Sequence, residues 1–308
     1  MNLIHIKRLM MDQAAAANMD MIILGDSRVL GVDARYMSDR LSRDFGRHFL
    51  VYNFAMPNQG VRSYQIFLQK YLKKGNPPKY VMFSSAPFAI TGLYALEKHK
   101  DSRDLLYRMM HMYNMREVIG KLPWKVSLRL LGLKIEGLIH IVHYRKAIRE
   151  GIRGAGNFQH DYFDEMARYV WATNGAYQLN NFSRIPREMI LQSGYYNIPL
   201  NLDADMDKEY RKFFELSRRH GIIVFLITAP INEIIYDKRE KLNENDYYRG
   251  VLAQWAAEYP NIRIVEPSLR SYPAEDFTDT QHMNPRGVGR FVKDLTNEVA
   301  AQIGGGSI

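Results

Sequence analysis

Residues 21–28 read Met-Ile-Ile-Leu-Gly-Asp-Ser-Arg and join a short apolar run to a turn. Four consecutive apolar residues that end at a glycine are typical of a strand buried on both faces of a parallel sheet. A serine follows at the expected carboxyl end of this strand, where doubly wound folds bind their ligands. The stretch therefore predicts the first strand of an α/β domain with a hydroxyl group at its binding edge.

Strand-like and helix-like segments alternate along the rest of the chain. Further strands are predicted at 48–54, 80–84, 222–228 and 262–265, and helices at 35–45, at 61–74 and from about Asp205 onward. The strand segments are short and rich in apolar, β-branched and aromatic residues, whereas the helical ones mix polar and apolar positions. Five strands separated by helices predict a parallel, doubly wound sheet.

A long segment interrupts this alternation after the third strand. It spans about 110 residues, which is too long for a loop in a compact domain. We therefore divide the chain into an α/β domain at residues 1–90 and 205–308 and an insertion at 91–204, which is helical in its middle and irregular toward its end.

Basic residues recur at near-helical spacing in the middle of the insertion: Lys121, Lys125, Arg129, Lys134, Arg145, Lys146, Arg149 and Arg153. One interpretation is a pair of amphipathic helices packed on the core. The other is a basic surface that rests on an anionic membrane or contacts an acidic polymer. Residues 157–199 are rich in Tyr, Asn and Gly, as expected of loops beside a substrate cleft.

The composition limits the chemistry. The chain has 308 residues, 46% of them hydrophobic and 24% charged, as in a globular protein, and its net charge is +9. This charge suits an anionic partner without identifying it. The absence of cysteine excludes disulfides, thiolate zinc sites and thiol nucleophiles, so a nucleophile must be an oxygen or a nitrogen.

The N-terminal segment does not look like a targeting signal. Residues 1–18 contain the basic pair Lys7-Arg8 but no apolar run of signal-peptide length, and no segment reaches the roughly 20 apolar residues of a membrane span. We expect residues 1–20 to form a helix that leads into the first strand of a soluble chain. A longer natural chain with a membrane anchor upstream of Met1 is the alternative.

Gly25-Asp26-Ser27-Arg28 contains the first candidate for catalysis. A serine just past the first strand projects its hydroxyl group into the ligand crevice, which is a suitable position for a nucleophile. The alternative is that Ser27 only caps the next helix. Arg28 either neutralises an acidic substrate or forms an ordinary salt bridge.

The second candidate is Asp279-Thr280-Gln281-His282, which precedes a predicted helix. An aspartate three residues before a histidine can accept a hydrogen bond from Nδ1–H and direct the other ring nitrogen toward a serine. Asn284-Pro285 fits the cap and first position of a helix, which would fix His282 just outside it. A chance pairing with a surface histidine is the alternative.

Together, Gly25-Asp26-Ser27 and Asp279-x-x-His282 resemble the motifs of the SGNH (GDSL-like) hydrolase family. The resemblance covers residues 21–88 and 205–291. It implies a flavodoxin-like three-layer fold and acyl transfer, with Ser27 as the nucleophile, His282 as the general base and acid, and Asp279 as the partner that orients His282.

This chain departs from the family's pattern at two motifs. The family has an asparagine and, five positions later, a glycine whose N–H enters the oxyanion hole; Asn58 stands at that glycine position here, five residues after Asn53. The backbone of Asn58 and that of Ser27 are the expected oxyanion donors. The family's Gly-x-Asn-Asp block is replaced by residues 84–88, Ser-Ser-Ala-Pro-Phe, so a third donor is missing.

The departures and the large insertion resemble a divergent branch that includes the D-alanyl transfer protein of lipoteichoic acid synthesis and polysaccharide O-acetylation proteins of the alginate type. This resemblance implies an enzyme outside the cytoplasmic membrane, anchored by a segment absent here, although a cytoplasmic location stays open. It implies an acyl ester or carbohydrate substrate, and an anionic membrane surface is a further partner suggested by the basic insertion.

We therefore expect a serine-dependent acyl-ester hydrolase or acyltransferase that acts on a cell-envelope carbohydrate or lipid-linked polymer. The alternative is a non-catalytic scaffold that binds such a polymer, which the missing third block favours. The mechanism needs no cofactor, and His140/His143, a spacing that suits one face of a helix, has no carboxylate beside it for a metal. Nucleic-acid binding is not expected, since only the net charge favours it.

Overall fold

The computed structural model describes residues 3–57, 60–91, 168–177, 185–193 and 197–305. Several predicted features lie outside these residues: Asn58, the basic middle of the insertion and the pair His140/His143. In the part of the chain that the structure describes, no helix combines the length and apolar character needed to cross a membrane.

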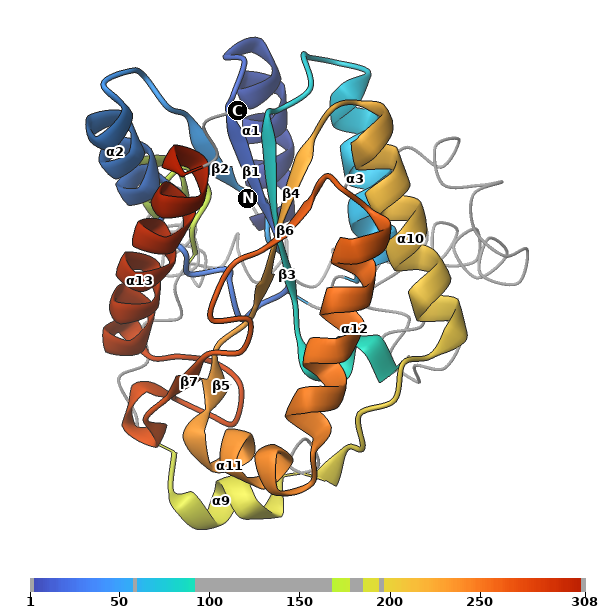
Figure 1. Ribbon diagram of the computed structural model, residues 1–308. Helices are drawn as coiled ribbons and strands as arrows, with labels where there is room; N and C mark the ends of the chain where they lie inside the picture. The colour runs from blue at the N-terminus through green and yellow to red at the C-terminus, as the bar shows by residue number, and fades with distance from the viewer. Residues whose placement is uncertain (1–2, 58–59, 92–167, 178–184, 194–196, 306–308) are drawn as a thin grey trace, which may run out of the picture.

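A five-stranded parallel sheet forms the centre of the molecule, with the strand order β2-β1-β3-β4-β6 (Figure 1). The strands are β1 (Met21–Leu24), β2 (Val51–Asn53), β3 (Tyr80–Ser85), β4 (Ile223–Thr228) and β6 (Ile262–Ile264). This strand order is that of flavodoxin-like folds, in which ligands bind at the carboxyl ends of the strands beside the first strand. The predicted fold class is confirmed.

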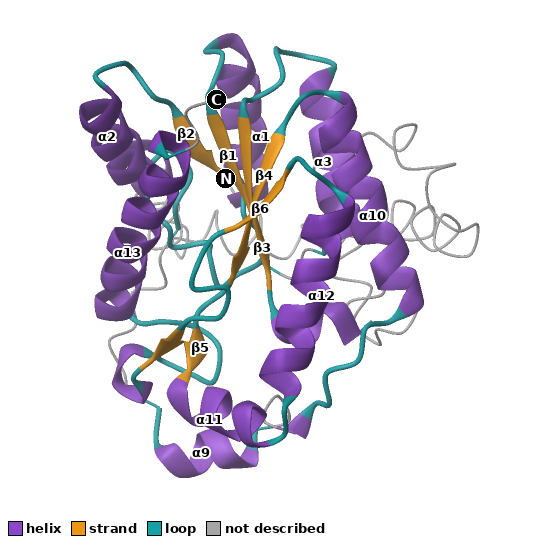
Figure 2. Ribbon diagram, in the orientation of Figure 1, coloured by secondary structure: helices purple, strands orange, loops and turns teal. Residues whose placement is uncertain are grey.

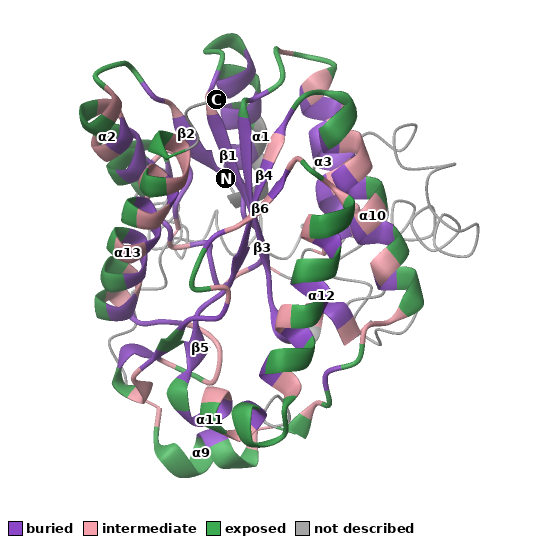
Figure 3. Cartoon of the chain, in the orientation of Figure 1, coloured by how far each residue is buried: buried purple, intermediate pink, exposed green. Residues whose placement is uncertain are grey.

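Helices cover both faces of the sheet (Figure 2). One face carries α2 (Ala34–Phe45) and α13 (Pro285–Gly304), and the other carries α1 (Leu3–Ala16), α3 (Val61–Leu72), α10 (Ala204–Arg219) and α12 (Glu244–Glu258). Successive residues of β1 alternate between these layers, because Ile22 and Leu24 pack in the core beneath α3 and α10, whereas Met21 and Ile23 pack beneath α2 and α13. Figure 3 shows that the central strands are buried.

A smaller layer lies beyond the carboxyl ends of the central strands (Figure 2). It contains the two-stranded parallel sheet of β5 (Ile231–Asn232) and β7 (Ser271–Tyr272), the helices α9 (Arg187–Gln192) and α11 (Glu233–Lys241), and the short 3-10 helices η1 (Pro87–Thr91) and η4 (Ala274–Asp276). No sequence pattern predicted β5, β7 or η4. This layer surrounds the edge of the sheet where the site residues lie.

Part of the predicted insertion packs against the edge strand β2. The N–H of Asn53 donates to the carbonyl of Asn174 at 2.8 Å, and the N–H of Tyr177 donates to the carbonyl of Leu30 at 2.9 Å. Gly175 has a φ of +106°, and a Cβ atom there would lie 2.1 Å from the carbonyl oxygen of Asn53. Only glycine fits this approach, which brings residues 168–177 against β2, and the hydrogen bond of Tyr177 joins them to the loop after β1.

Candidate active site

Ser27 lies in the turn that follows β1, seven residues before α2. The cap of α2 is Asp33, whose side chain accepts a hydrogen bond from the N–H of Tyr36 at 3.0 Å. Ser27 therefore does not cap this helix. Gly25 is required at the start of the turn, because a Cβ atom there would lie 2.4 Å from Val29 and 2.8 Å from the Cβ of Ser84.

Asn53, the last residue of β2, holds the loop that carries Ser27. Its buried Nδ2 donates to the carbonyl oxygens of Val29, Leu30 and Val32 at 3.0, 3.3 and 2.9 Å, and its Oδ1 accepts from the N–H of Ala55 at 2.8 Å. One amide thus satisfies four backbone groups that would otherwise lack these partners. The sequence indicates Asn53 only as the start of a family motif, and its positioning role becomes evident only from these contacts.

A buried lysine of α1 also contacts the end of β2. Lys7, in α1, is fully buried and donates from Nζ to the carbonyl oxygen of Asn53 at 2.7 Å. Burial lowers the pKa of Lys7 well below its ordinary value, because the charged form has lost its hydration.

Asp26 and Arg28 form a buried ion pair on either side of Ser27. Oδ1 of Asp26 accepts from the backbone N–H of Arg28 at 3.0 Å and from its Nε at 2.8 Å, and Oδ2 accepts from Nη2 of the guanidinium. Of the two interpretations of Arg28, the salt bridge is present. The paired contacts fix the turn and so the direction of the Ser27 side chain.

The loop before α13 presents His282. The Oδ1 of Asp279 accepts hydrogen bonds from the N–H groups of Gln281 and His282, both at 2.8 Å, and the N–H of Thr278 donates to the carbonyl of His282 at 2.9 Å. Asn284 caps α13 by accepting from the N–H of Gly287 at 3.0 Å, and Pro285 is the first helical residue. The predicted start of this helix is confirmed.

The two loops bring the three predicted residues together at the carboxyl edge of the sheet. Ser27 Oγ lies 2.7 Å from His282 Nε2, and His282 Nδ1 lies 2.7 Å from Asp279 Oδ2. If the ring proton is on Nδ1, this N–H donates a hydrogen bond to Asp279, and Nε2 accepts one from the hydroxyl group of Ser27. This tautomer gives a continuous relay from serine to carboxylate, the arrangement that activates a serine for nucleophilic attack.

The electrostatics of Asp279 suit its place in the relay. Partial burial raises its pKa, but the hydrogen bond and charge of His282 and the two backbone N–H groups lower it by more, so the pKa of Asp279 lies below its ordinary value. The carboxylate is therefore ionised at neutral pH and stabilises a positively charged imidazole beside it.

The backbone of Ser27 is available as an oxyanion donor. Within the residues that the structure describes, the N–H of Ser27 makes no hydrogen bond. The second expected donor, Asn58, lies outside those residues. Where the family's third block would stand, Ser85 Oγ bonds the hydroxyl group of Tyr210 at 2.8 Å in the buried interior.

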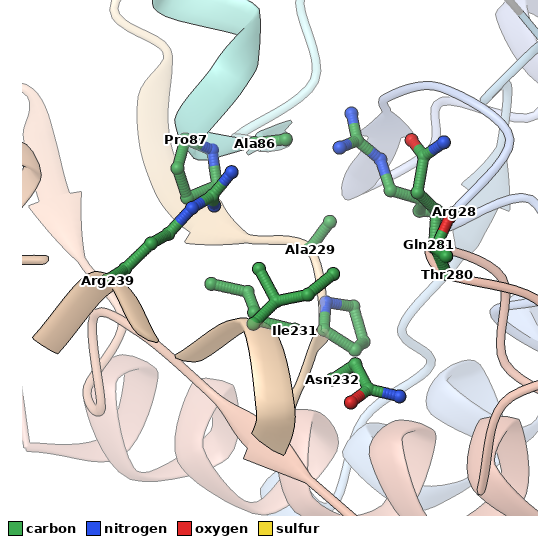
Figure 4. A pocket seen from close by; sticks show the side chains of 11 residues that line it. Arg28, Ala86, Pro87, Ala229, Ile231, Asn232, Arg239, Thr280 and Gln281 are labelled. Atoms are coloured by element: carbon green, nitrogen blue, oxygen red, sulfur yellow. The ribbon is translucent and has the colours of Figure 1, made fainter. Parts of the chain in front are cut away.

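Two pockets flank the turn. Asp26 lines one, together with Gly60, Tyr64 and Ser84, and Arg28 lines the other, which Figure 4 shows. Among the described residues, no group of three His, Cys, Asp or Glu side chains is arranged to hold a metal ion. The neighbours of Ser27 in the chain, Asp26 and Arg28, thus each line a different pocket.

Comparison with known proteins identifies a family whose description names no activity. No curated protein matches the chain. The family model described as "Protein of unknown function (DUF1574)" matches residues 6–295, a range that includes Ser27, Asp279 and His282. The chain therefore belongs to the DUF1574 family.

Proposed function

We propose that this protein is a serine-dependent acyl-ester hydrolase or acyltransferase of the SGNH (GDSL-like) type that acts on a cell-envelope carbohydrate or lipid-linked polymer. The observation that carries the proposal is the relay of Ser27, His282 and Asp279, with both hydrogen bonds at 2.7 Å. The relay lies at the edge of a doubly wound sheet where such folds bind ligands.

The first half of the reaction forms an acyl-enzyme. The Oγ of Ser27 attacks the ester carbonyl carbon while its proton passes to His282 Nε2, and the Ser27 N–H stabilises the resulting oxyanion, with Asn58 as the proposed second donor. The intermediate then collapses, the bond to the leaving alcohol breaks, and His282 returns the proton to that alcohol.

The second half regenerates the serine. Water or a sugar hydroxyl group gives its proton to His282 and attacks the acyl carbon, after which the bond to Ser27 Oγ breaks and His282 returns the proton to it. Water yields hydrolysis, and a sugar hydroxyl group yields acyl transfer. Nδ1 of His282 keeps its proton throughout and donates a hydrogen bond to Asp279, whose negative charge stabilises the charged imidazole.

Two features support the SGNH type. The serine lies directly after the first strand and the Asp-x-x-His motif lies after the last strand of the large sheet, as in that family. The sheet order β2-β1-β3-β4-β6 is also the one that the resemblance implies. We further propose that the enzyme works outside the cytoplasmic membrane, where envelope polymers are exposed.

A fluorophosphonate probe tests the proposal, because it reacts readily with an activated serine and much more slowly with an ordinary serine hydroxyl group. We expect covalent labelling of the wild type at Ser27, and loss of labelling in Ser27→Ala and His282→Ala. Ser271→Ala, which removes an exposed serine of β7, serves as the matched control and should be labelled as the wild type is. A folded wild type without labelling at Ser27 would contradict the proposal and favour a binding scaffold.

A further inference from the structure

The pocket that Arg28 lines has buried guanidinium and amide groups among its lining residues. The pocket opens to solvent and lies between the loop after β1, the residues after β3, the helix α11 with the residues before it, and the loop that carries His282 (Figure 4). It adjoins the relay, because Arg28 follows Ser27 and Gln281 precedes His282 in the chain.

Asn232 contributes an unsatisfied donor to this pocket. Its side chain is fully buried, and its Oδ1 caps α11 by accepting from the N–H of Ile234 at 3.0 Å. Its Nδ2 is buried and has no hydrogen-bond partner in the structure as described. A buried donor of this kind calls for a partner, and in a pocket wall a bound ligand is one.

Arg239 contributes a buried cation. Its side chain is 4% exposed, and its Nε lies 3.9 Å from Glu244 Oε2, which is beyond hydrogen-bond distance. Burial and the nearby charge of Arg28 lower the pKa of Arg239 to about 10, although Glu244 opposes them. The guanidinium is still charged at neutral pH but only weakly compensated by this carboxylate, and a second anion would stabilise it.

Arg28 and Arg239 approach the pocket from opposite sides (Figure 4). Arg28 is already paired with Asp26, so its role here does not depend on a free charge. No acidic residue is among the described residues that line the pocket. An anion that enters between the two guanidinium groups therefore meets no carboxylate among these lining residues.

Apart from Thr280 and Gln281, the rest of the wall is apolar. Ala86, Pro87, Ile231 and Ile235 line it between the two arginines. Such a wall accommodates a short carbon skeleton that carries the anionic group, as is usual in small-molecule sites where a few polar groups fix the orientation.

We infer that this pocket recognises a carboxylate or phosphate group on the ester that Ser27 attacks, with Asn232 and Arg239 as its specificity-determining residues. The inference rests on the proposed function, since it assigns the pocket to that substrate. The substrate class is then an anionic acyl ester, and the pocket provides a binding site for the charged groups of envelope polymers.

Binding of inorganic phosphate and of succinate, measured by calorimetry at constant ionic strength, tests the pocket without requiring catalysis. We expect the wild type and Ser27→Ala to bind at least one of the two anions, and the stronger one identifies the group. Asn232→Asp keeps the cap of α11 but replaces the donor with a carboxylate, and Arg239→Gln removes the cation. Each should weaken binding by about 10- to 100-fold.

Two matched variants are the controls. Lys241→Gln removes an exposed cation from the same helix, and Asn243→Asp makes the same change as Asn232→Asp at an exposed position. Both should bind the anion as the wild type does. If the wild type and Ser27→Ala bind neither anion, or if Asn232→Asp and Arg239→Gln bind as tightly as their controls, the inference is wrong.

The rate of fluorophosphonate labelling links the pocket to Ser27. Anion at a concentration equal to the Kd of the wild type should slow labelling of the wild type and slow labelling of Arg239→Gln much less. Anion binding that does not slow labelling would contradict the assignment to the ester substrate. A wild type that binds the anion but is never labelled would overturn the proposed function while preserving the anion site, so the two failures are distinguishable.

Discussion

Nδ2 of Asn53 donates to the carbonyl oxygen of Val29 at 3.0 Å and so ties the end of β2 to the loop that carries Ser27. The same nitrogen also reaches the carbonyls of Leu30 and Val32. The position of the candidate nucleophile thus depends on a side chain from a neighbouring strand as well as on its own turn.

Replacing Asn53 with alanine should lower the free energy of unfolding by about 2 to 3 kcal/mol, because the carbonyl groups of Val29 and Leu30 each lose one of two donors and that of Val32 loses its bond to Asn53. Urea denaturation measures this change. Labelling of Ser27 should also slow, since the loop is no longer held. Asn76→Ala, which removes an exposed asparagine that bonds Asn18 at 2.7 Å, should change the stability by less than about 0.5 kcal/mol. Equal effects of the two substitutions would contradict the role of Asn53.

Asp279 has two roles that substitution can separate. Asp279→Asn keeps an oxygen for the N–H groups of Gln281 and His282 but removes the charge that faces Nδ1. We expect a near-normal melting temperature and a fall of about 10²- to 10⁴-fold in ester turnover.

Asp279→Ala should reduce turnover at least as much and also lower the melting temperature, because the loop loses both backbone contacts. Turnover with a 4-nitrophenyl ester and thermal denaturation measure the two effects. Full activity in Asp279→Asn would exclude a charge-stabilising role for the carboxylate.

The stability of the protein should depend on Lys7 at alkaline pH. The pKa of Lys7 is lowered in the folded state, so the unfolded chain binds more protons between the folded pKa and the ordinary value of 10.5. Stability therefore rises with pH across that window, with a slope of up to about 1.4 kcal/mol per pH unit from this group. Lys7→Met should flatten the slope.

Urea denaturation at several pH values between 7 and 10 measures this slope. The control is Lys73→Met, which removes an exposed lysine next to α3 and should leave the slope unchanged. An identical slope in wild type and Lys7→Met would show that Lys7 is charged when buried.

Two glycines of α13 offer a matched pair. A Cβ atom at Gly287 would lie 2.4 Å from the carbonyl oxygen of Asp276, whereas none of the surrounding atoms lies within 4 Å of a Cβ at Gly289. Gly287→Ala should therefore push apart the helix and the segment before His282, at a cost of about 1 to 3 kcal/mol. Gly289→Ala should gain about 0.5 to 1 kcal/mol from its better helix propensity. Thermal denaturation compares them, and similar values would refute the close packing.

Local sequence patterns predicted the large sheet well because each of its strands is an apolar run. β1 was predicted with its observed ends, and β3, β4 and β6 within one residue. β2 is shorter than the predicted 48–54, since only Val51–Asn53 pair with β1. The approach to it is held by side chains instead: Asp20 accepts from the N–H of Leu50 at 2.9 Å.

The features that the sequence did not reveal depend on distant contacts. β5 and β7 have two residues each and pair across 40 positions, Ile231 with Ser271, which is too little for a periodic signal. Ser27, Asp279 and His282 were recognisable because their motifs are local. Asn232 and Arg239 resemble an ordinary helix cap and an ordinary surface arginine, and only tertiary packing buries them in the wall of a pocket that Arg28 also lines.

The hydrogen bond between Ser27 and His282 joins positions 255 residues apart. During synthesis, β1 and Ser27 leave the ribosome long before His282, which lies just before the last helix, α13. Contacts of such long separation form late, because the intervening chain must first be ordered. An unfinished or C-terminally truncated chain therefore carries a serine without its base, and any reactivity of Ser27 would report that the entire α/β domain has assembled.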